Sequence, residues 1–349
     1  MTLDRISRLQ LEIEPGQCLF ISNLLNVRYL SGFTGSNAAL LVTDSTAILA
    51  TDSRYEIQAA QQVPDLQVFI GRNFPELLLG KLAKSEVIVE GTDLSIDSYQ
   101  KLVSSFEHQF TSRTGLVESM RVVKDESEIA LIKQACEIST NAFTDIIGSV
   151  RVGQTEKAIR NNLEQRMREL GADDIAFASI VASGPNSAIP HHEPTDREVM
   201  SGDLLKIDFG AKVNGYHADC TRTVVIGQAS SWQIELHAAV TEAQASGRKT
   251  IRSDIEFADV ESAVNQALTD SGYRDYFTHG LGHGVGLAIH EDPFFGRVEA
   301  AKIMPNTVIT IEPGAYLKDK GGVRVEDTIV VNSNGYLNLT NLPYELLEL

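Results

Sequence analysis

The chain has 349 residues, enough for two domains whose cores are large enough to need no disulfide bonds. Its 30 Lys and Arg residues against 47 Asp and Glu residues give a net charge of -17, which disfavours a protein that binds nucleic acid or an anionic membrane. Three cysteines, no signal-peptide pattern and no apolar run long enough to span a bilayer predict a cytoplasmic protein.

The first third contains five short β-rich runs and one helix-like stretch at 55–63. Strands that alternate with short helices are typical of an α/β or α+β module. We expect this module to form a first domain over residues 1–122. The expected strands are 18–22, 38–43, 46–51, 66–71 and 86–91.

Helical periodicity takes over after this module, and we expect a second domain over residues 123–349. The segment 125–147 has apolar residues at helical spacing and an acidic first turn, which suits the helix dipole. The order helices, paired strands, helices, paired strands is a weak duplication of pattern without a sequence repeat. The expected elements are helices at 125–147 and 155–170, strands at 204–213 and 216–226, helices at 231–247 and 255–271, a glycine-rich stretch and two final strands.

The most informative segment is the pair of β-like runs on either side of Asn214-Gly215, a dipeptide that favours a type I′ hairpin turn. With a two-residue turn, Asp208 faces Thr221, so Asp208 and Asp219 share one face as diagonal neighbours. Two carboxylates on one face repel, and burial among the apolar residues of this hairpin raises that cost unless a cation lies between them. The alternative is a solvated face with two ordinary acids.

Two further acids occur in strand settings near the end of the chain. Glu312 ends an apolar strand before a Pro-Gly turn, and Glu326 lies inside the apolar strand 321–331. Isolated acids are rarely buried, so both positions favour a functional role. Arg324 is predicted to share the face of Glu326 and to orient it, with a simple surface ion pair as the alternative.

Five of the eight histidines fall in two loops rich in glycine and proline. Glycine allows a close backbone approach, which suits a loop folded around a site. The glycine-rich segment contains neither a P-loop nor a zincin HExxH motif. His217 shares the face of Asp208 but lies close to the turn, so we expect it outside the ligand set. The five loop histidines are His191, His192, His279, His283 and His290.

Four carboxylates and one imidazole are a suitable ligand set for two divalent cations, whose charge of +4 matches the -4 of the acids. A water held between two such ions would lose a proton near neutral pH and become a nucleophile. A carboxylate-rich site suits Mn²⁺, and Co²⁺ and Zn²⁺ are compatible alternatives.

Five motifs, in order along residues 120–331, resemble the metallopeptidases of the pita-bread fold, which include aminopeptidase P, prolidase and methionine aminopeptidase. The motifs are IDFGA, HADCTRT, GHGVGLAIHE, TIEPG and GGVRVED. By this resemblance, His191 and His290 match the histidines that steady the substrate carbonyl and the tetrahedral intermediate, and Glu312 doubles as proton acceptor and donor. The resemblance also implies five metal ligands, of which the second and the last bridge the two ions: Asp208, Asp219, His283, Glu312 and Glu326.

The segments 26–42 and 49–63 resemble the creatinase-like accessory domain of the proline-specific members. Their GFTGS, DSRY and QA pattern is closer to aminopeptidase P and its small bacterial relatives than to prolidase. The resemblance therefore implies a creatinase-like N-terminal domain followed by a pita-bread catalytic domain, in a homodimer. Creatinase shares the fold but lacks the metal ligands, so the intact five-ligand set argues against it.

The expected function is that of a dinuclear metal aminopeptidase, which hydrolyses the Xaa-Pro bond at peptide N-termini through a metal-bridging hydroxide. The alternatives are an Xaa-Pro dipeptidase with the same chemistry, a catalytically silent binding protein on this fold, and a metallohydrolase with a non-peptide substrate. Many prolidases have an arginine directly after the proline that follows the His-Glu pair. Here the nearest basic residue is Arg297, several positions further on, which favours the aminopeptidase.

Overall fold

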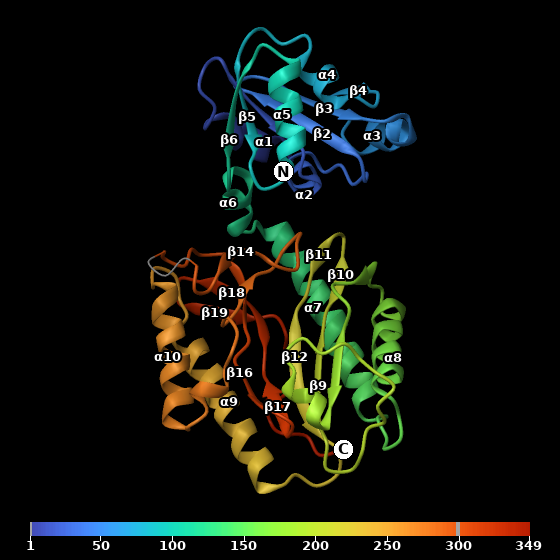
Figure 1. Ribbon diagram of the computed structural model, residues 1–349, viewed down its shortest axis with the longest axis vertical. Helices are drawn as coiled ribbons and strands as arrows, with labels where there is room; N and C mark the ends of the chain where they lie inside the picture. Colours follow the sequence, from blue (N-terminus) through green and yellow to red (C-terminus); the bar gives the residue numbers. More distant parts are fainter. Residues whose placement is uncertain (1, 298–300) are drawn as a thin grey trace. The chain divides into compact units, whose positions relative to one another are not determined.

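A computed structural model describes residues 2–297 and 301–349 of the chain. The chain divides into two compact units, Met1–Arg121 and Val122–Leu349 (Figure 1). Both units contain helices and strands, which confirms the expected α/β class. No helix in the described ranges has both the length and the apolar composition that a membrane crossing requires.

The N-terminal unit is built on one mixed sheet with the strand order β4-β3-β2-β1-β5-β6. Five of these strands lie where the sequence predicts them, with ends that shift by no more than one residue. The sixth, β6 (Gln109–Arg113), was not predicted, because its mainly polar and partly exposed side chains carry no hydrophobic signal. The other elements of this unit are α1 (Thr2–Gln10), β1 (Gln17–Ile21), α2 (Leu24–Ser31), β2 (Ala38–Thr43), β3 (Ala47–Thr51), η1 (Ser53–Tyr55), α3 (Glu56–Gln62), β4 (Gln67–Ile70), α4 (Phe74–Leu79), β5 (Glu86–Glu90), α5 (Ile96–Ser105) and α6 (Leu116–Val122).

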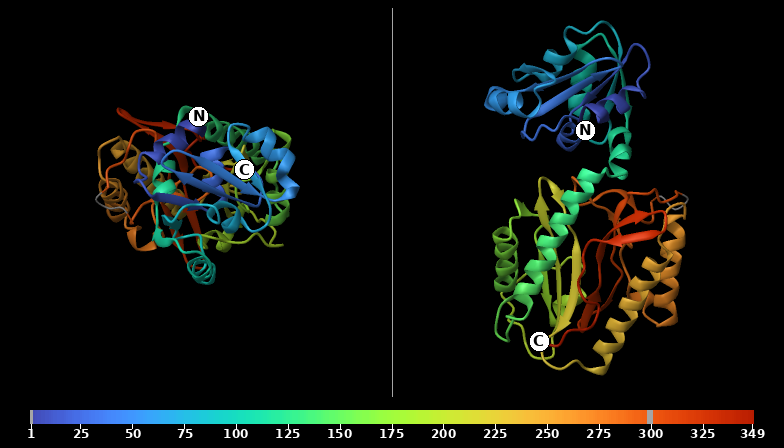
Figure 2. Two further views of the ribbon diagram at one scale, coloured as in Figure 1. Left: turned by 90° about the horizontal axis from the view of Figure 1, so that it is seen from above. Right: turned by 180° about the vertical axis from the view of Figure 1, so that it is seen from behind.

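The long helices of the C-terminal unit occupy the segments that helical periodicity predicts. They are α7 (Glu126–Ile147), α8 (Glu156–Glu169), α9 (Ser231–Thr250) and α10 (Phe257–Asp270). Asp125 and Glu128 form a capping box at the start of α7, and Thr155 caps α8 by accepting a hydrogen bond from the backbone of Ala158. Seen from behind in Figure 2, α7 and α9 pass in front of the strands, so these helices cover one face of the strand layer.

The first hairpin of the C-terminal unit bends from one sheet into another. The two strands farther from the turn, β9 (Leu204–Phe209) and β12 (Cys220–Val225), pair with each other, and β9 also pairs with β8 (Ile180–Ser183). Beyond the bend, β10 (Ala211–Val213) pairs with β11 (Tyr216–His217), in a different sheet that also contains β7. The bend therefore falls at Gly210 in one arm and at 218–219 in the other. The short strand β7 spans Asp174–Ile175, and the 3-10 helix η2 spans Gly184–Ala188.

The second hairpin bends in the same way. The sequence predicted two continuous final strands, and this number was wrong. Each run breaks into two strands: β15 pairs with β18, and β16 pairs with β17 in a separate sheet. The breaks fall at 312–313 and 325–326. The elements of this part are η3 (Arg274–Tyr276), β13 (His283–Gly284), β14 (Glu291–Phe294), β15 (Val308–Ile311), β16 (Gly314–Leu317), β17 (Gly321–Arg324), β18 (Asp327–Asn332) and β19 (Gly335–Asn338).

One core cluster joins α10 to the second hairpin. Val260 and Val264 of α10 are fully buried in the same cluster as Ile309, Ile311 and Ile329. Each such side chain stabilises the fold by roughly 1.5–3 kcal/mol when fully buried. This packing therefore holds the hairpin, and the residues at its bend, in one arrangement.

Candidate metal centre

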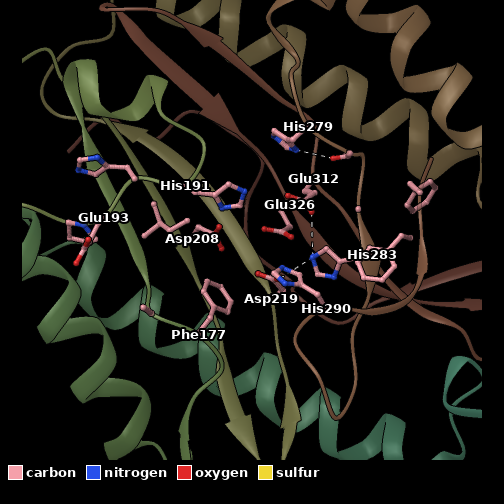
Figure 3. A pocket seen from close by; sticks show the side chains of 18 of the residues that line it. Phe177, His191, Glu193, Asp208, Asp219, His279, His283, His290, Glu312 and Glu326 are labelled. Carbon is pink, nitrogen blue, oxygen red and sulfur yellow. Dashed lines mark hydrogen bonds and ion pairs between the residues drawn. The ribbon is translucent and has the colours of Figure 1, made fainter. Parts of the chain in front are cut away.

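The four carboxylates expected from the sequence all lie where a hairpin bends out of its sheet. Asp208 is near the end of β9, and Asp219 comes directly before β12. Glu312 directly follows β15, and Glu326 comes directly before β18. Because both hairpins bend at these points, four acids from distant parts of the chain meet in one place (Figure 3).

The first hairpin has the register that its turn predicts. Asn214 and Gly215 have φ values of 48° and 76°, both positive, as a type I′ turn requires. Asp208 pairs with Thr221, as expected for a two-residue turn. A slip by one residue would move Asp208 to the opposite face, so this turn decides where the carboxylate points.

The bend of this hairpin requires a glycine at position 210. A Cβ atom there would lie 1.8 Å from the carbonyl oxygen of Ala218, so no side chain fits. The close approach brings the two arms together beside Asp208 and Asp219. Oxygen atoms of these two acids and of Glu326 all lie within 4.8 Å of one another.

Glu326 lies in a break of a strand that the sequence predicts to be continuous. Its backbone N–H donates to the carbonyl oxygen of Thr221 at 3.1 Å, in an isolated bridge that ties the second hairpin to the first. The hydroxyl of Thr221 donates to Oε2 of Glu326 at 2.6 Å. The prediction of an uninterrupted strand was wrong, and the interruption places Glu326 against the first hairpin.

His283 reaches the same cluster from the glycine-rich segment. Its Nε2 lies 3.6 Å from Oδ2 of Asp219 and 3.5 Å from Oε1 of Glu312. Its Nδ1 lies 3.0 Å from the carbonyl oxygen of Gly284, a contact that needs a proton on Nδ1 and leaves the lone pair of Nε2 toward the acids. Burial lowers the pKa of His283 to about 4, so its ring is neutral at pH 7, as a metal ligand must be.

The carboxylates of the cluster are costly to ionise together. Burial, aided by repulsion from Asp208, raises the pKa of Glu312 to about 8, although Arg324 acts to lower it. The pKa values of Asp219 and Glu326 are raised well above their ordinary values, first by burial and then by the neighbouring carboxylates. Without a compensating cation, the folded protein therefore favours the protonated forms of these acids.

The donors of the cluster fit divalent cations. Oδ1 of Asp208 is buried and has no hydrogen-bond partner within the described part of the chain, so an acceptor is open there. Oxygen donors with a neutral imidazole suit hard and borderline dications, and two of them would balance four carboxylates. The sets whose donor atoms all lie within 4.8 Å of one another are Asp208 with Asp219 and Glu326, His283 with Glu312 and Glu326, and Asp219 with His283 and His290.

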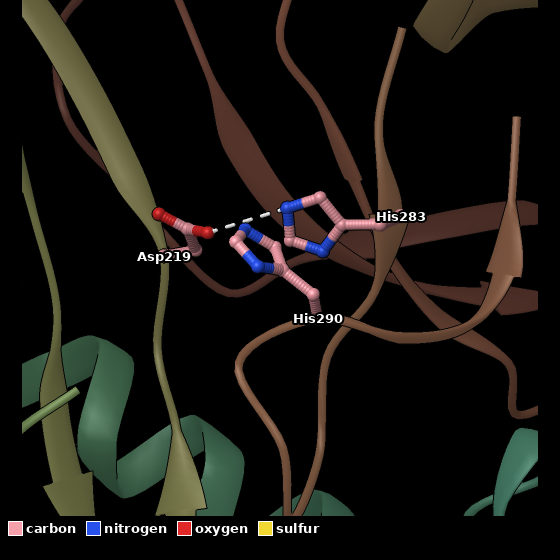
Figure 4. A group of neighbouring side chains, drawn as sticks. All are labelled: Asp219, His283 and His290. Carbon is pink, nitrogen blue, oxygen red and sulfur yellow. Dashed lines mark ion pairs between the residues drawn. The ribbon is translucent and has the colours of Figure 1, made fainter. Parts of the chain in front are cut away.

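A cavity of about 860 Å³ extends over this cluster, a volume typical of small-molecule and peptide sites. All five loop histidines line it: His191, His192, His279, His283 and His290. The rings of His283 and His290 meet edge to face with centroids 4.3 Å apart, and Figure 4 shows both beside Asp219. A nitrogen of His290 also lies within 4.8 Å of the donor atoms of Asp219 and His283.

His217 belongs to none of the candidate ligand sets among the described residues, as expected from its place close to the turn. Its Nδ1 lies 3.0 Å from the carbonyl oxygen of Gly286, so it braces the glycine-rich segment. His279 lines the cavity and contacts the hydroxyl of Tyr316 through Nε2 at 2.8 Å. Tyr316 follows the TIEPG motif by two residues, but no pattern in the sequence marked it.

Arg324 binds Asp208, and its hydrogen-bonded link to Glu326, the acid that it was predicted to orient, passes through Thr221. Its guanidinium donates to Oδ2 of Asp208, to the hydroxyl of Tyr316 at 2.9 Å and to the hydroxyl of Thr221 at 3.1 Å. Thr221 in turn donates to Glu326, so the arginine reaches that acid through one hydroxyl. The strand break between positions 324 and 326 ends the alternation on which the prediction was based.

A buried ion pair braces the segment that carries His290. Nζ of Lys124 lies 2.9 Å from Oε1 of Glu291, and their side chains are only 1% and 7% exposed. Oε2 of Glu291 accepts a hydrogen bond from the backbone N–H of Ala288 at 3.0 Å. The pair therefore fixes the turn that precedes His290.

We expect Lys124→Met to lower the free energy of unfolding by about 3–5 kcal/mol, because it deprives a buried carboxylate of its cation. Urea unfolding followed by circular dichroism measures the change. The matched control is Lys157→Met, which breaks an exposed ion pair with Asp196 and should cost less than about 1 kcal/mol. Equal losses for the two variants would contradict a bracing role for Lys124.

Each of the two units matches a known protein family. Residues 130–333 match the metallopeptidase family M24, and residues 5–123 match the creatinase/prolidase N-terminal domain. The chain is 34% identical over 94% of its length to an Xaa-Pro dipeptidase of Pyrococcus furiosus, of which it also covers 94%.

Two solved structures share the fold over nearly all of the chain. An Xaa-Pro dipeptidase from Bacillus anthracis superposes with a TM-score of 0.96 at 32% identity, and each chain is covered completely. An X-Pro aminopeptidase from Thermotoga maritima superposes with a TM-score of 0.90 at 37% identity, over 98% of this chain and 100% of that one. The expected fold, with a creatinase-like domain before a pita-bread domain, is confirmed.

Proposed function

This chain belongs to the metallopeptidase family M24, and on that premise we propose that it is an aminopeptidase that hydrolyses the Xaa-Pro bond at peptide N-termini. The main support for this proposal is the cluster of four acids and His283 that lines a cavity, in which Oδ1 of Asp208 is an acceptor without a partner among the described residues. The names of relatives, which include both Xaa-Pro dipeptidases and an X-Pro aminopeptidase, support activity at such a bond. In this proposal, residues 123–349 carry the chemistry and residues 1–122 form an accessory domain.

The proposed ligands hold two divalent ions, for which the preponderance of carboxylates favours Mn²⁺ over Co²⁺ and Zn²⁺. When bound, such ions polarise the substrate carbonyl and lower the pKa of water. Asp219, Glu326 and His283 each belong to two of the three sets, and the two carboxylates, with two oxygens each, are the proposed ligands that would serve both ions. The ligand set is Asp208, Asp219, His283, Glu312 and Glu326.

Three side chains are proposed to act on the peptide itself. His191 and His290 line the cavity. Their proposed role is to donate hydrogen bonds to the carbonyl oxygen as it gains negative charge. Glu312 takes the proton from the attacking water and passes it to the leaving proline nitrogen. Arg324 keeps Asp208 in place through their buried ion pair.

The cavity wall favours substrates longer than a dipeptide. The arginines among its described residues are Arg160 and Arg297; the first is half-buried and the second is exposed. The guanidinium of Arg297 lies over the ring of Phe294 at 4.4 Å. A strict dipeptidase needs a cation that fixes the carboxylate of its short substrate, and a buried arginine would do so most strongly. Neither arginine of the described cavity wall is buried.

We expect the Mn²⁺-loaded protein to cleave Xaa-Pro-Yaa tripeptides with at least about tenfold higher kcat/KM than Xaa-Pro dipeptides. The carboxylate of a bound dipeptide would lie on the proline itself, inside the cavity, where it finds no buried cation in the described part of the wall to replace its water. The measurement is the release of the N-terminal residue from the two substrates under identical metal loading. Failure to cleave either substrate would contradict the proposed function as a whole.

The second candidate is an Xaa-Pro dipeptidase, and it is favoured by the fact that Arg297 reaches the cavity in spite of its displaced position. In that case the ratio of kcat/KM values is reversed, and Arg297→Ala raises the KM for dipeptides roughly tenfold. Arg274→Ala, which removes a similar arginine over the ring of Phe277, is the matched control. A reversed ratio that Arg297→Ala leaves unchanged would assign the carboxylate contact to another residue.

We further propose that the protein is a homodimer of the cytoplasm. Its three cysteines are buried and free of disulfide bonds, which suits a reducing compartment. Light scattering at micromolar concentration should give twice the chain mass of 38.1 kDa.

A further inference from the structure

A fully buried carboxylate outside the metal cluster accepts an unusual number of hydrogen bonds. Glu156, the first residue of α8, has no exposed surface. Its Oε1 accepts from the backbone N–H of Ser183 at 2.7 Å, from the hydroxyl of Ser183 at 2.8 Å and from Nδ2 of Asn186 at 2.9 Å. Its Oε2 accepts from Nε2 of His192 at 2.9 Å and from the N–H and hydroxyl of Thr195 at 2.9 and 2.8 Å.

All of these donors belong to one segment, residues 183–195, which begins at the last residue of β8, lies in the connection to β9 and carries His191. Ser183 lies at the start of the segment and Thr195 at its end, so a single carboxylate ties the two ends together. The contact between Nε2 of His192 and Oε2 of Glu156 fixes the residue directly after His191. His191 itself is exposed and lines the cavity.

The residue before His191 is held from the opposite side. The carbonyl oxygen of Pro190 accepts hydrogen bonds from Arg324 at 3.1 Å and from Nζ of Lys206 at 3.2 Å. Nζ of Lys206 also donates to the carbonyl oxygen of Ile189 at 2.6 Å. His191 therefore lies between a residue whose carbonyl oxygen Arg324 and Lys206 hold and a residue whose ring Glu156 holds.

The carboxylate of Glu156 is strongly favoured over its protonated form. Burial alone would raise the pKa of Glu156, but hydrogen bonds from Asn186, His192, Thr195 and Ser183 outweigh it and lower the pKa to about 2. Each of these contacts is a charge-assisted hydrogen bond, about twice as strong as a neutral one. A glutamine at this position would turn its amide N–H₂ toward at least one group that cannot accept, because a backbone N–H contacts each of the two oxygens.

We propose that Glu156 is a positioning residue for the reaction: its carboxylate orders the segment 183–195 so that His191 meets the substrate carbonyl. The proposal rests on the role given above to His191. Glu156 does not line the cavity, so its effect on the reaction must pass through the segment that it holds.

The first test is amide hydrogen exchange of Glu156→Gln, which needs no enzymatic activity. We expect faster exchange within residues 183–195 and unchanged exchange in β15 and β18, together with an unchanged metal content. Glu164→Gln is the matched control, because it removes a carboxylate from the same helix whose contact is the backbone N–H of Ser179. Unchanged exchange in residues 183–195 would overturn the proposal.

The second test is a double-mutant cycle with His191→Ala. Glu156→Gln should lower kcat/KM about tenfold to a hundredfold through kcat, because a small misplacement of a positioned group is costly. In the His191→Ala background the same substitution should have an effect of less than about threefold. Effects that multiply would show that Glu156 does not act through His191, and would overturn the proposal.

If Glu156→Gln does not fold, Thr195→Val carries both tests, because it removes one donor at 2.8 Å from the same carboxylate. The expected change is then smaller, about threefold in kcat/KM, and a change in neither test overturns the proposal. A wild-type protein that binds metal but cleaves no Xaa-Pro peptide would contradict the proposed function alone. Hydrogen exchange would then still decide whether Glu156 orders the segment.

Discussion

Asp219→Ala is expected to lower kcat/KM at least about a thousandfold, equivalent to ~4 kcal/mol of transition-state stabilisation, and to lower the metal content with it. Asp219 belongs to two of the three candidate ligand sets and lies 3.6 Å from His283, so its loss affects both proposed ion positions. Metal analysis by mass spectrometry and a peptide assay on the same preparation measure the two effects. Asp174→Ala, which removes an exposed acid of the same unit, should change neither by more than about twofold.

The same variant separates loss of metal from loss of folding. Asp219 is buried among acids that repel it, so its removal relieves repulsion in the metal-free protein. We therefore expect the metal-free variant to unfold at a temperature no lower than that of the metal-free wild type at pH 8. Activity retained at full metal loading would contradict the proposed bridging role of Asp219.

Removal of the metal is expected to make the stability of the protein fall with rising pH between 6.5 and 8. The pKa of Glu312 is raised from 4.5 to about 8, so the folded state holds a proton that the unfolded state has already lost. A carboxyl with a raised pKa stabilises the fold fully below its unfolded pKa, and this contribution is lost as the pH rises through the folded pKa. The slope is about 1.4 kcal/mol per pH unit for each such group, and Asp219 and Glu326 act in the same direction.

His283 does not reverse this effect within the chosen window. Burial lowers the pKa of His283 to about 4, so its contribution is complete above 6.5 and is lost only as the pH falls toward 4. Chemical unfolding of the chelated protein at pH 6.5 and 8 should thus give a loss of at least about 2 kcal/mol. Addition of Mn²⁺ should restore the stability most strongly at pH 8, where fewer protons must leave. If the free energy of unfolding of the chelated protein stays constant or rises from pH 6.5 to 8, the proposed cost of ionising these carboxylates together would be contradicted.

The parts of the site that the sequence predicted depend on local rules. Asn214-Gly215 predicts its turn type, and the turn determines that Asp208 and Asp219 share a face. The helices were predictable because their apolar spacing and caps are local as well. The positions of Glu312 and Glu326 could be predicted as unusual because an acid in an apolar strand is visible in the sequence alone.

The parts that were missed depend on contacts between distant residues. The break before Glu326 follows from its bridge to Thr221, a pairing across 105 positions that no local pattern marks. The same break separates Arg324 from Glu326 and leaves the arginine to Asp208. Glu156 gave no signal because an acid in the first turn of a helix is ordinary, and its partners lie up to 39 residues away.

The proposal that two divalent ions in this cluster carry out peptide hydrolysis is tested most directly by one titration. Metal-free protein is loaded stepwise with Mn²⁺, and the rate of hydrolysis of an Xaa-Pro-Yaa tripeptide is measured against the number of ions bound per chain. We expect two ions to bind and the rate to reach its maximum as the second site fills. A protein that binds two ions and leaves the Xaa-Pro bond intact, or one that cleaves it at full rate without metal, would contradict the account.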